Sequence, residues 1–398
     1  MISHLKNSNV KIAVVGLGYV GWPLFVLLSR KYACLGLDID QGRLHKLKEG
    51  DNPETTKSVL TNTYEDLHAC NIFIVCVPTG VDENNKPDLS PLKDVCKSLG
   101  GIIRRGCTVI FESTVFPGAT EEICIPLLEK YSSLRVNKDF SVGYSPERIN
   151  VGDHKHSLGN IPKVISATND EALELLSTIY SSIIVAPIIR ASSIKVAEAA
   201  KMYENTQRDV LIALANEYSS YCKAEGINIE EVTDCASSKW NFNRVNPGLV
   251  GGHCIGIDPY YLLSRAQYYH LSLPLIKCAR TINEAKVENV CDKIIEIATE
   301  INARTILLLG VTYKANTNDC RNSKSLEIFY RLKEEFFVDC FDPNIEKDRI
   351  KEDFNLNVIT HWKELHTNYD LVVRLVNHLE FENLTFPKSK FITLEDLL

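Results

Sequence analysis

The stretch VKIAVVGLGYVGWPLFVLLSRKY (Val10–Tyr32) decides the fold, because an apolar strand pattern runs into three glycines and then into a helical pattern. Gly16, Gly18 and Gly21 have the G-x-G-x-x-G spacing. The first glycine permits a tight turn, the second lets backbone approach a pyrophosphate, and the third allows close packing of helix on strand. The positive end of the helix favours phosphate. The stretch therefore predicts a dinucleotide-binding unit.

The type of dinucleotide is indicated by Asp38, which closes the next strand pattern, LGLDID, about 20 residues after Gly16. An aspartate there can accept hydrogen bonds from both ribose hydroxyls, and it would repel the 2′-phosphate of NADP. We therefore expect NAD, although Arg43 would weaken that preference. Further predicted cofactor contacts lie in the same loop and at later strand ends that share the sheet edge: Tyr19, Val20, Thr79 and Thr114.

The remaining chain continues an α/β layout with a helical interruption. Apolar runs, each expected to be a strand and the last of them SIIVAP (182–187), alternate with helical patterns as far as residue 187. This alternation predicts a parallel sheet covered on both faces. A single long helix follows over 194–226, with Gly226 as its stop, and ARTILLLGVTY restarts a strand near 303. We expect two Rossmann-like, doubly wound parallel-sheet domains (1–187 and 301–398). We expect a long-helix dimerisation domain (188–300) to join them, and we therefore expect a homodimer.

Composition excludes several classes of partner. The 398 residues carry a formal charge of −7 without a basic stripe, so neither nucleic acid nor a membrane surface is an expected partner. No window approaches the roughly 20 apolar residues of a membrane span, and the amino terminus has no secretion-signal pattern. Thirteen cysteines occur without a CxxC pair, as expected of reduced thiols in a cytoplasmic protein. No metal-ligand spacing is present, so no metal is expected.

One thiol has unusual surroundings, in GLVGGHCIGIDP (Gly248–Pro259). Gly251 and Gly252 would let the loop wrap around a ligand. Asp258 followed by proline is typical of a helix start, with Asp258 as the N-cap. Cys254 is thus expected near a helix amino terminus, where the dipole makes a thiol nucleophilic. The spacing equally fits an ordinary cap and a small residue beside glycines.

Two polar residues of the long helix, Lys201 and Asn205, are four apart and share a face. They could form a solvated face or stabilise an oxyanion. His253 is expected to have a structural or substrate-contact role, because adjacent residues in a tight loop rarely face each other. A nicotinamide pocket with an activated cysteine predicts a four-electron oxidation of an alcohol to an acid through a thioester.

The ordered series of motifs resembles the UDP-glucose/GDP-mannose dehydrogenase family, and within it the UDP-N-acetylhexosamine 6-dehydrogenases. The motifs are GLGYVG, VPTGVDENNKPDLSPL, FESTVFPG, SPERIN, EAAKMYENTQRDVLIALANE, KWNF, PGLVGGHCIGIDPYYL, TYKANTNDCRNSKSL and DCFDP. The resemblance covers nearly the whole chain. It implies an NAD domain, a helical dimerising middle and a UDP-binding domain.

The resemblance also implies roles for single residues. Cys254 would be the nucleophile, with Asp258 positioning or deprotonating the water and Lys201 and Asn205 stabilising oxyanions. Glu147 would serve thioester hydrolysis, and Thr114 would hold the catalytic water. The implied substrate contacts are Arg148, Lys201, Asn205, Arg244 across a dimer interface, Gly251, Gly252, His253 and Lys314, and Arg321 would reach the NAD diphosphate.

Departures from the family pattern bear on the sugar. UDP-glucose enzymes usually carry lysine where Ile257 stands and glutamate where Val151 stands, so both positions favour an N-acetylhexosamine. The expected function is NAD-dependent oxidation of UDP-N-acetylglucosamine to its uronic acid, for cell-surface polysaccharide precursors. The N-acetylmannosamine, N-acetylgalactosamine and glucose analogues are alternatives. Two other classes are a 3-hydroxyacid dehydrogenase, giving one NADH per substrate, and a silent nucleotide-sugar sensor, giving none.

Overall fold

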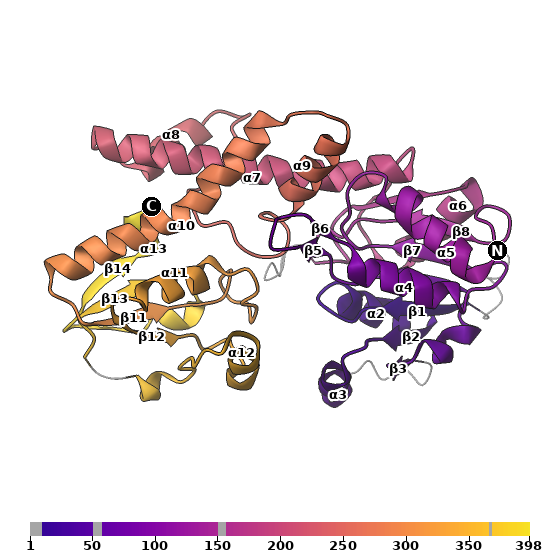
Figure 1. Cartoon of the computed structure of the whole chain (residues 1–398), viewed down its shortest axis with the longest axis horizontal. Helices are drawn as coiled ribbons and strands as arrows, with labels where there is room; N and C mark the ends of the chain where they lie inside the picture. The colour runs from indigo at the N-terminus through magenta and orange to yellow at the C-terminus, as the bar shows by residue number, and fades with distance from the viewer. Residues whose placement is uncertain (1–9, 51–57, 150–156, 366–367) are drawn as a thin grey trace. The chain divides into compact units, whose positions relative to one another are not determined.

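The structure, a computed structural model, describes residues 10–50, 58–149, 157–365 and 368–398 (Figure 1). Its internal contacts divide the chain into two compact units. The first unit comprises Met1–Glu204 with Tyr260–Tyr268, and the second comprises Asn205–Pro259 with Tyr269–Leu398. The residues at 1–9 and Val151 lie outside the described ranges.

The first unit is built on an eight-stranded sheet with the order β10-β9-β8-β7-β4-β1-β2-β3. Six of its strands are mutually parallel, whereas β9 pairs antiparallel with β8, and β10 follows β9 in parallel. The strands are β1 (Lys11–Val15), β2 (Ala33–Leu37), β3 (Val59–Thr61), β4 (Ile72–Val75), β7 (Thr108–Phe111), β8 (Ser141–Tyr144), β9 (Lys163–Ala167) and β10 (Ile188–Arg190); β5 (Gly80–Val81) and β6 (Pro87–Asp88) form a separate hairpin.

The central strands are apolar because helices cover the sheet. Every residue of β4 and β7 is buried, as are four of the five residues of β1. Strands buried on both faces read as continuous apolar runs, and this confirms the predicted α/β fold. The helices of this unit are α2 (Gly21–Ser29), α3 (Gln41–Glu49), α4 (Ser90–Gly100), α5 (Ile125–Ser132) and α6 (Asp170–Ile183), with shorter turns η1 (Tyr64–Ala69) and η2 (Thr120–Cys124).

The last part of this sheet differs from the prediction. The run SIIVAP was expected to be a strand, but α6 continues to Ile183 and β10 starts only at Ile188. Pro187 ends the intervening segment, and its carbonyl accepts the Lys163 amide (3.1 Å) where β9 and β10 begin to pair. The sheet is parallel, as predicted, except that β9 runs antiparallel to β8. This reversal brings the first residue of β9 to the carboxyl edge of the parallel strands.

Long helices connect the two sheets along the chain. α7 (Ile194–Glu225) is the predicted 32-residue helix, and Gly226 follows it in a left-handed conformation (φ 70°). The boundary between the two units falls within α7. The others are α8 (Ile229–Ser237), α9 (Asp258–Tyr268) and α10 (Pro274–Glu300). Within the described ranges, no helix has the length and apolar character required to span a membrane.

The second unit contains a four-stranded parallel sheet with the order β12-β11-β13-β14. Apolar residues pack on both of its faces, one cluster including Leu308 and Val373 and the other including Leu307 and Val372. Successive residues of one strand belong to the two clusters in turn, which shows that both faces of the sheet are covered, as predicted. Its elements are β11 (Thr305–Leu309), α11 (Lys324–Leu332), β12 (Phe337–Phe341), α12 (Lys347–Phe354), η3 (Trp362–Glu364), β13 (Leu371–Arg374), η4 (Leu379–Phe381), β14 (Lys390–Thr393) and α13 (Leu394–Leu397).

Candidate active site

The glycine-rich loop of the first unit has the geometry that a dinucleotide requires. Gly16 is left-handed (φ 90°), and a Cβ on it would lie 2.9 Å from the Cys76 carbonyl oxygen. A Cβ on Gly21, where α2 begins, would lie 1.8 Å from the Gly16 carbonyl oxygen. A Cβ on Gly18 would meet no described atom within 4 Å, so protein packing does not require this glycine. Close approach of a pyrophosphate explains it, and the loop therefore fits the predicted cofactor.

Asp38 directly follows β2 and is fixed at the base of this loop. One carboxylate oxygen accepts the Leu17 amide (2.8 Å), and the other accepts the Asp40 amide (3.0 Å). Arg43 lies at the same place, because its Nε donates to the Leu17 carbonyl oxygen (3.2 Å). Asp40, rather than Asp38, caps α3. The carboxylate of Asp38 is thus held beside the turn that would carry the ribose and diphosphate, and Tyr19 and Val20 complete that turn before α2.

The loops after β4 and β7 are tied together at the carboxyl edge of the sheet. The Thr79 hydroxyl donates to the Thr114 carbonyl oxygen (2.7 Å), and the Ser113 hydroxyl donates to the Val77 carbonyl oxygen (2.7 Å). The structure therefore brings Thr79 and Thr114 together, as expected for residues that share a switch-point edge. The Thr79 hydroxyl orders the loop by donating to backbone, and its oxygen retains acceptor capacity.

Glu147 follows β8 and belongs to a buried ionic cluster that no sequence motif indicates. Continuing the antiparallel register beyond Tyr144 places Glu147 opposite Lys163. The Lys163 ammonium lies 3.3 Å from Glu147 and 2.8 Å from Glu112. Glu112 also accepts the hydroxyl of Tyr180, which comes from α6. We name these four residues the Lys163 cluster.

The Lys163 cluster places one cation between two carboxylates away from water. The side chain of Lys163 is 1% exposed, that of Glu112 0% and that of Glu147 9%. Burial alone would lower the pKa of Lys163, but the two carboxylates raise it above its ordinary value. Burial raises the pKa of Glu112 despite the ammonium. No motif signals Lys163, because its place depends on the reversal of β9.

Glu147 also fixes the backbone that follows it. Its second oxygen accepts the amides of Arg148 and Ile149, both at 2.6 Å. Arg148, a predicted substrate contact, pairs with Glu204 of α7 (2.7 Å) and donates to the Pro162 carbonyl oxygen (3.1 Å). The carboxylate is therefore held in one orientation at the edge of the sheet.

Cys254 of the second unit lies in a turn that leads straight into α9. Gly252 is left-handed (φ 80°), and the Cys254 carbonyl oxygen accepts the amides of Ile257 (3.0 Å) and Asp258 (2.9 Å). Cys254 is exposed, whereas ten of the thirteen cysteines are buried, and none of the thirteen is in a disulfide. Its position just before a helix amino end is the one that favours a thiolate.

Asp258 differs in detail from its predicted role as a cap. It is the first residue of α9 rather than the residue before the helix, because its amide already bonds to the Cys254 carbonyl. Its carboxylate is buried and accepts the side-chain amide of Asn205 (2.5 Å). The structure thus brings two predicted site residues together. Lys201 lies one turn before Asn205 on α7 and is buried, so these positions do not form a solvated face.

His253 is bound to a buried carboxylate that the sequence did not single out. Its Nε2 lies 3.0 Å from Asp319, which also binds the guanidinium of Arg321 through Nε (3.0 Å) and a terminal nitrogen (3.1 Å). Burial, and then the nearby Arg321, lower the pKa of His253 to about 4. His253 is therefore neutral at pH 7, and its Nε2 proton is directed at the Asp319 carboxylate.

Two predicted substrate contacts lie elsewhere in the second unit. Arg244 pairs with Asp234 in an exposed region after α8. Lys314 lies in the loop after β11, where its carbonyl oxygen accepts the hydroxyls of Thr312 (3.0 Å) and Thr317 (2.8 Å). These bonds fix the backbone at Lys314 and do not involve its side chain, which is half-buried.

Comparison with family models gives three consecutive matches. Residues 10–184 match the NAD binding domain of the UDP-glucose/GDP-mannose dehydrogenase family, residues 195–285 match its central domain, and residues 307–394 match its UDP binding domain. The predictions of NAD as the cofactor and of a UDP-sugar substrate are thereby confirmed.

Individual relatives agree with these matches. The chain is 43% identical over 392 residues to UDP-N-acetyl-D-glucosamine 6-dehydrogenase of Pseudomonas aeruginosa, covering 95% of this chain and 92% of that protein. It is 44% identical to Protein CapL of Staphylococcus aureus, covering 94% and 91%. Among solved structures, UDP-D-ManNAc dehydrogenase of Pyrococcus horikoshii superimposes with a TM-score of 0.87 at 29% identity, covering 98% and 96%. The predicted fold and the resemblance are confirmed.

Proposed function

Because the chain belongs to the UDP-glucose/GDP-mannose dehydrogenase family, we propose that it oxidises the C6 hydroxyl of UDP-N-acetylglucosamine to the uronic acid. The product would serve as a precursor of a cell-surface polysaccharide. Support for this sugar comes from the relative with 43% identity, compared with 29% for the N-acetylmannosamine enzyme of known structure. Ile257, in place of the lysine expected of UDP-glucose enzymes, points to the same branch.

The glycine-rich loop and Asp38 are proposed to hold the dinucleotide. Gly18 admits the diphosphate against backbone, Asp38 binds the ribose, and the α2 amino end faces the phosphates. NAD, when bound, supplies the acceptor for a hydride in each of two oxidation steps. The loop that Thr79 and Thr114 tie together borders this edge, and we assign Thr114 to the catalytic water.

Cys254 is proposed to retain the sugar between the two oxidations. Its thiolate adds to the C6 aldehyde and forms a C–S bond, which gives a thiohemiacetal. Loss of a second hydride from C6 gives a thioester on the same sulfur. Water then attacks the carbonyl carbon, the C–S bond breaks, and the thiolate is regenerated. For each sugar, one water enters, and two hydrides and three protons leave.

The polar residues around these steps have proposed roles that their contacts support. Lys201 and Asn205 donate to the oxygen that gains charge at C6. Asp258, held by Asn205, orients the water or accepts its proton. Glu147, held by Lys163 and two backbone amides, serves thioester hydrolysis from the carboxyl edge of the first sheet.

The same proposal extends to the organisation of the chain. We assign 1–187 to NAD, 188–300 to a dimerising middle and 301–398 to the UDP-sugar. Arg148, Arg244, Gly251, Gly252, His253 and Lys314 are the proposed substrate contacts, and Arg321 is assigned to the NAD diphosphate. A homodimer through the middle segment would let Arg244 serve the partner's substrate. Ten buried thiols outside any disulfide support a reducing, cytoplasmic location.

The observation that carries the proposal is the exposed Cys254 in a glycine turn that runs directly into α9. The test is NADH formation by purified protein with a panel of UDP-hexoses and their N-acetylated epimers. UDP-N-acetylglucosamine should give the highest kcat/KM. Cys254→Ser should bind NAD normally but release no acid, whereas Cys235→Ala, a change at another exposed cysteine, should turn over normally. Full turnover by Cys254→Ala would refute the covalent route.

A further inference from the structure

The loop that carries Cys254 is held at two points by one residue, Asn322. The Asn322 side-chain amide donates to the Gly252 carbonyl oxygen (2.8 Å). In the opposite sense, the Gly252 amide donates to the Asn322 carbonyl oxygen (3.1 Å). Gly252 therefore has both of its backbone polar groups bonded to the same residue, two positions before the thiol. We name this pair of bonds the Asn322 clamp.

Close packing reinforces the Asn322 clamp. A Cβ on Gly251 would lie 2.6 Å from the Asn322 carbonyl oxygen, and a Cβ on Gly252 would lie 2.7 Å from the Tyr313 ring. Gly256, on the other side of the thiol, would place a Cβ 3.7 Å from the Asn322 side-chain nitrogen. Close packing against Asn322 and Tyr313 thus explains the paired glycines. Asn322 lies near the backbone on both sides of Cys254.

Asn322 is itself held in an unusual conformation and lies just before a helix. It is left-handed (φ 51°), which asparagine tolerates better than most residues. α11 begins two residues later, and its first residue, Lys324, pairs with Glu284 of α10 (2.7 Å) and with Glu327 (2.8 Å). Since Lys324 is buried, these bonds fix the start of α11, and with it Asn322.

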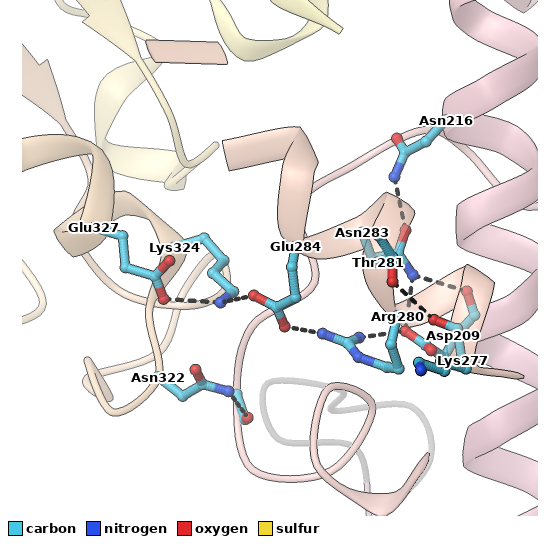
Figure 2. Close-up of polar contacts among 11 residues, drawn as sticks. Asp209, Asn216, Lys277, Arg280, Thr281, Asn283, Glu284, Asn322, Lys324 and Glu327 are labelled. Atoms are coloured by element: carbon cyan, nitrogen blue, oxygen red, sulfur yellow. Dashed lines mark hydrogen bonds and ion pairs between the residues drawn. The ribbon is translucent and has the colours of Figure 1, made fainter. Parts of the chain in front are cut away.

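A polar chain, buried except at Glu284, continues from α10 to α7. Glu284 accepts from Arg280, whose guanidinium pairs with Asp209 of α7 (2.6 Å). Asn283 also donates to Asp209 (2.8 Å). It accepts from Asn216, which lies about two turns after Asp209 on α7 (Figure 2). Asp209 is fully buried and lies one turn after Asn205, whose side-chain amide donates to Asp258. The residues that hold the thiol loop and those that hold its water-directing carboxylate are therefore anchored to the same helices.

We propose that Asn322 is a positioning residue that sets the orientation of the Cys254 sulfur through the Asn322 clamp, an inference that rests on the function proposed above. Attack on an aldehyde requires the sulfur at a defined distance and angle, and loss of one tethering bond spreads the loop over additional conformations. Because the proposed substrate contacts Arg148, Arg244 and Lys314 lie outside this loop, the effect falls on turnover more than on binding.

The test compares Asn322→Asp and Asn322→Gly with Asn316→Gly in the full-length protein. Aspartate keeps the size and tolerates the left-handed backbone but cannot donate to Gly252, and glycine removes the side chain while keeping the carbonyl acceptor. Asn316 is also left-handed (φ 57°) and lies in the same connection, but its side chain accepts from the Leu379 amide, so it is a matched control.

Two readouts are expected to change together. Hydrogen exchange of a peptide covering 248–258 should be at least about threefold faster in both Asn322 variants, while β11 stays protected. Their kcat with UDP-N-acetylglucosamine should fall by about tenfold, with KM changed by less than about twofold. Asn316→Gly should leave the loop's exchange and kcat unchanged.

The inference is overturned if exchange in the loop is unaltered, or if exchange accelerates while kcat stays at the wild-type value. A wild-type protein that oxidises no UDP-hexose would instead refute the proposed function. In that case the exchange measurement, which needs neither substrate nor NAD, still decides whether Asn322 holds the loop.

Discussion

Replacement of Lys163 by methionine should be severely destabilising, because it leaves two carboxylates in a buried site without their cation. Removing one partner of a buried ion pair costs about 3–5 kcal/mol, and here both Glu112 and Glu147 lose the same ammonium. For a domain of this size, about 3 kcal/mol lowers Tm by roughly 6–12 °C. Methionine retains most of the side-chain volume, so the loss is electrostatic rather than a cavity effect.

The defect should grow with pH. Once Lys163 is absent, burial without a cation raises the pKa of Glu112 further above its value in the unfolded chain. At pH values between the unfolded and the folded pKa, the folded state therefore binds more protons than the unfolded state. Stability then falls as pH rises through that interval. In the wild type, the raised pKa of Lys163 keeps the ammonium charged throughout neutral pH, and its contribution is constant there.

The assay is thermal unfolding at pH 5.5 and pH 8.0, with two controls. Lys97→Met removes the cation of an exposed, solvent-screened pair with Asp94 and should leave Tm nearly unchanged. Adding Glu112→Gln to Lys163→Met should recover part of the loss, since one buried charge is removed. The reasoning is refuted if Lys163→Met is no less stable than Lys97→Met, or if its defect is the same at both pH values.

Three further results are expected. Asp38→Ala should weaken NAD binding by about tenfold, measured by titration calorimetry, and should narrow the preference for NAD over NADP; unchanged affinity for both would contradict the assignment. Burial raises the pKa of Glu198 to about 7, so the free energy of unfolding declines as pH rises from about 4.5 toward 7 and this carboxyl loses its proton. Glu198→Gln should therefore reduce the dependence of Tm on pH between pH 5 and 8, and an unaltered dependence would argue against this. Because the pKa of His253 is about 4, His253→Gln should leave the pH dependence of kcat/KM between pH 6 and 8 unchanged, and a lost inflection near pH 6.5 would show that His253 titrates.

Local chemistry explains which parts of the fold were predictable. The turn at Gly16 and the carboxylate of Asp38 depend on conformation and spacing within one βαβ unit, which the sequence displays directly. The stop of α7 at Gly226 is equally local. The run SIIVAP was misassigned because a short apolar run does not show where a helix ends: α6 takes its first two residues, and the strand begins only after Pro187.

Long-range pairing explains what could not be predicted in the site. Lys163 reaches Glu147 only because β9 runs antiparallel to β8, and a single lysine before an apolar run does not reveal strand direction. Asn322 meets Gly252 across 70 residues, through a bond to backbone that requires no particular residue at the other end. Asp258 was expected to cap α9 and instead binds Asn205, because tertiary contact outweighed the local capping preference.

The central claim, oxidation of one sugar carbon twice on one thiol, is tested most directly by stoichiometry. A limiting amount of UDP-N-acetylglucosamine is incubated to completion with the protein and excess NAD, and NADH absorbance is compared with the uronic acid formed. The account predicts two NADH per sugar and one acid per sugar. One NADH per sugar with the aldehyde as the final product would contradict it.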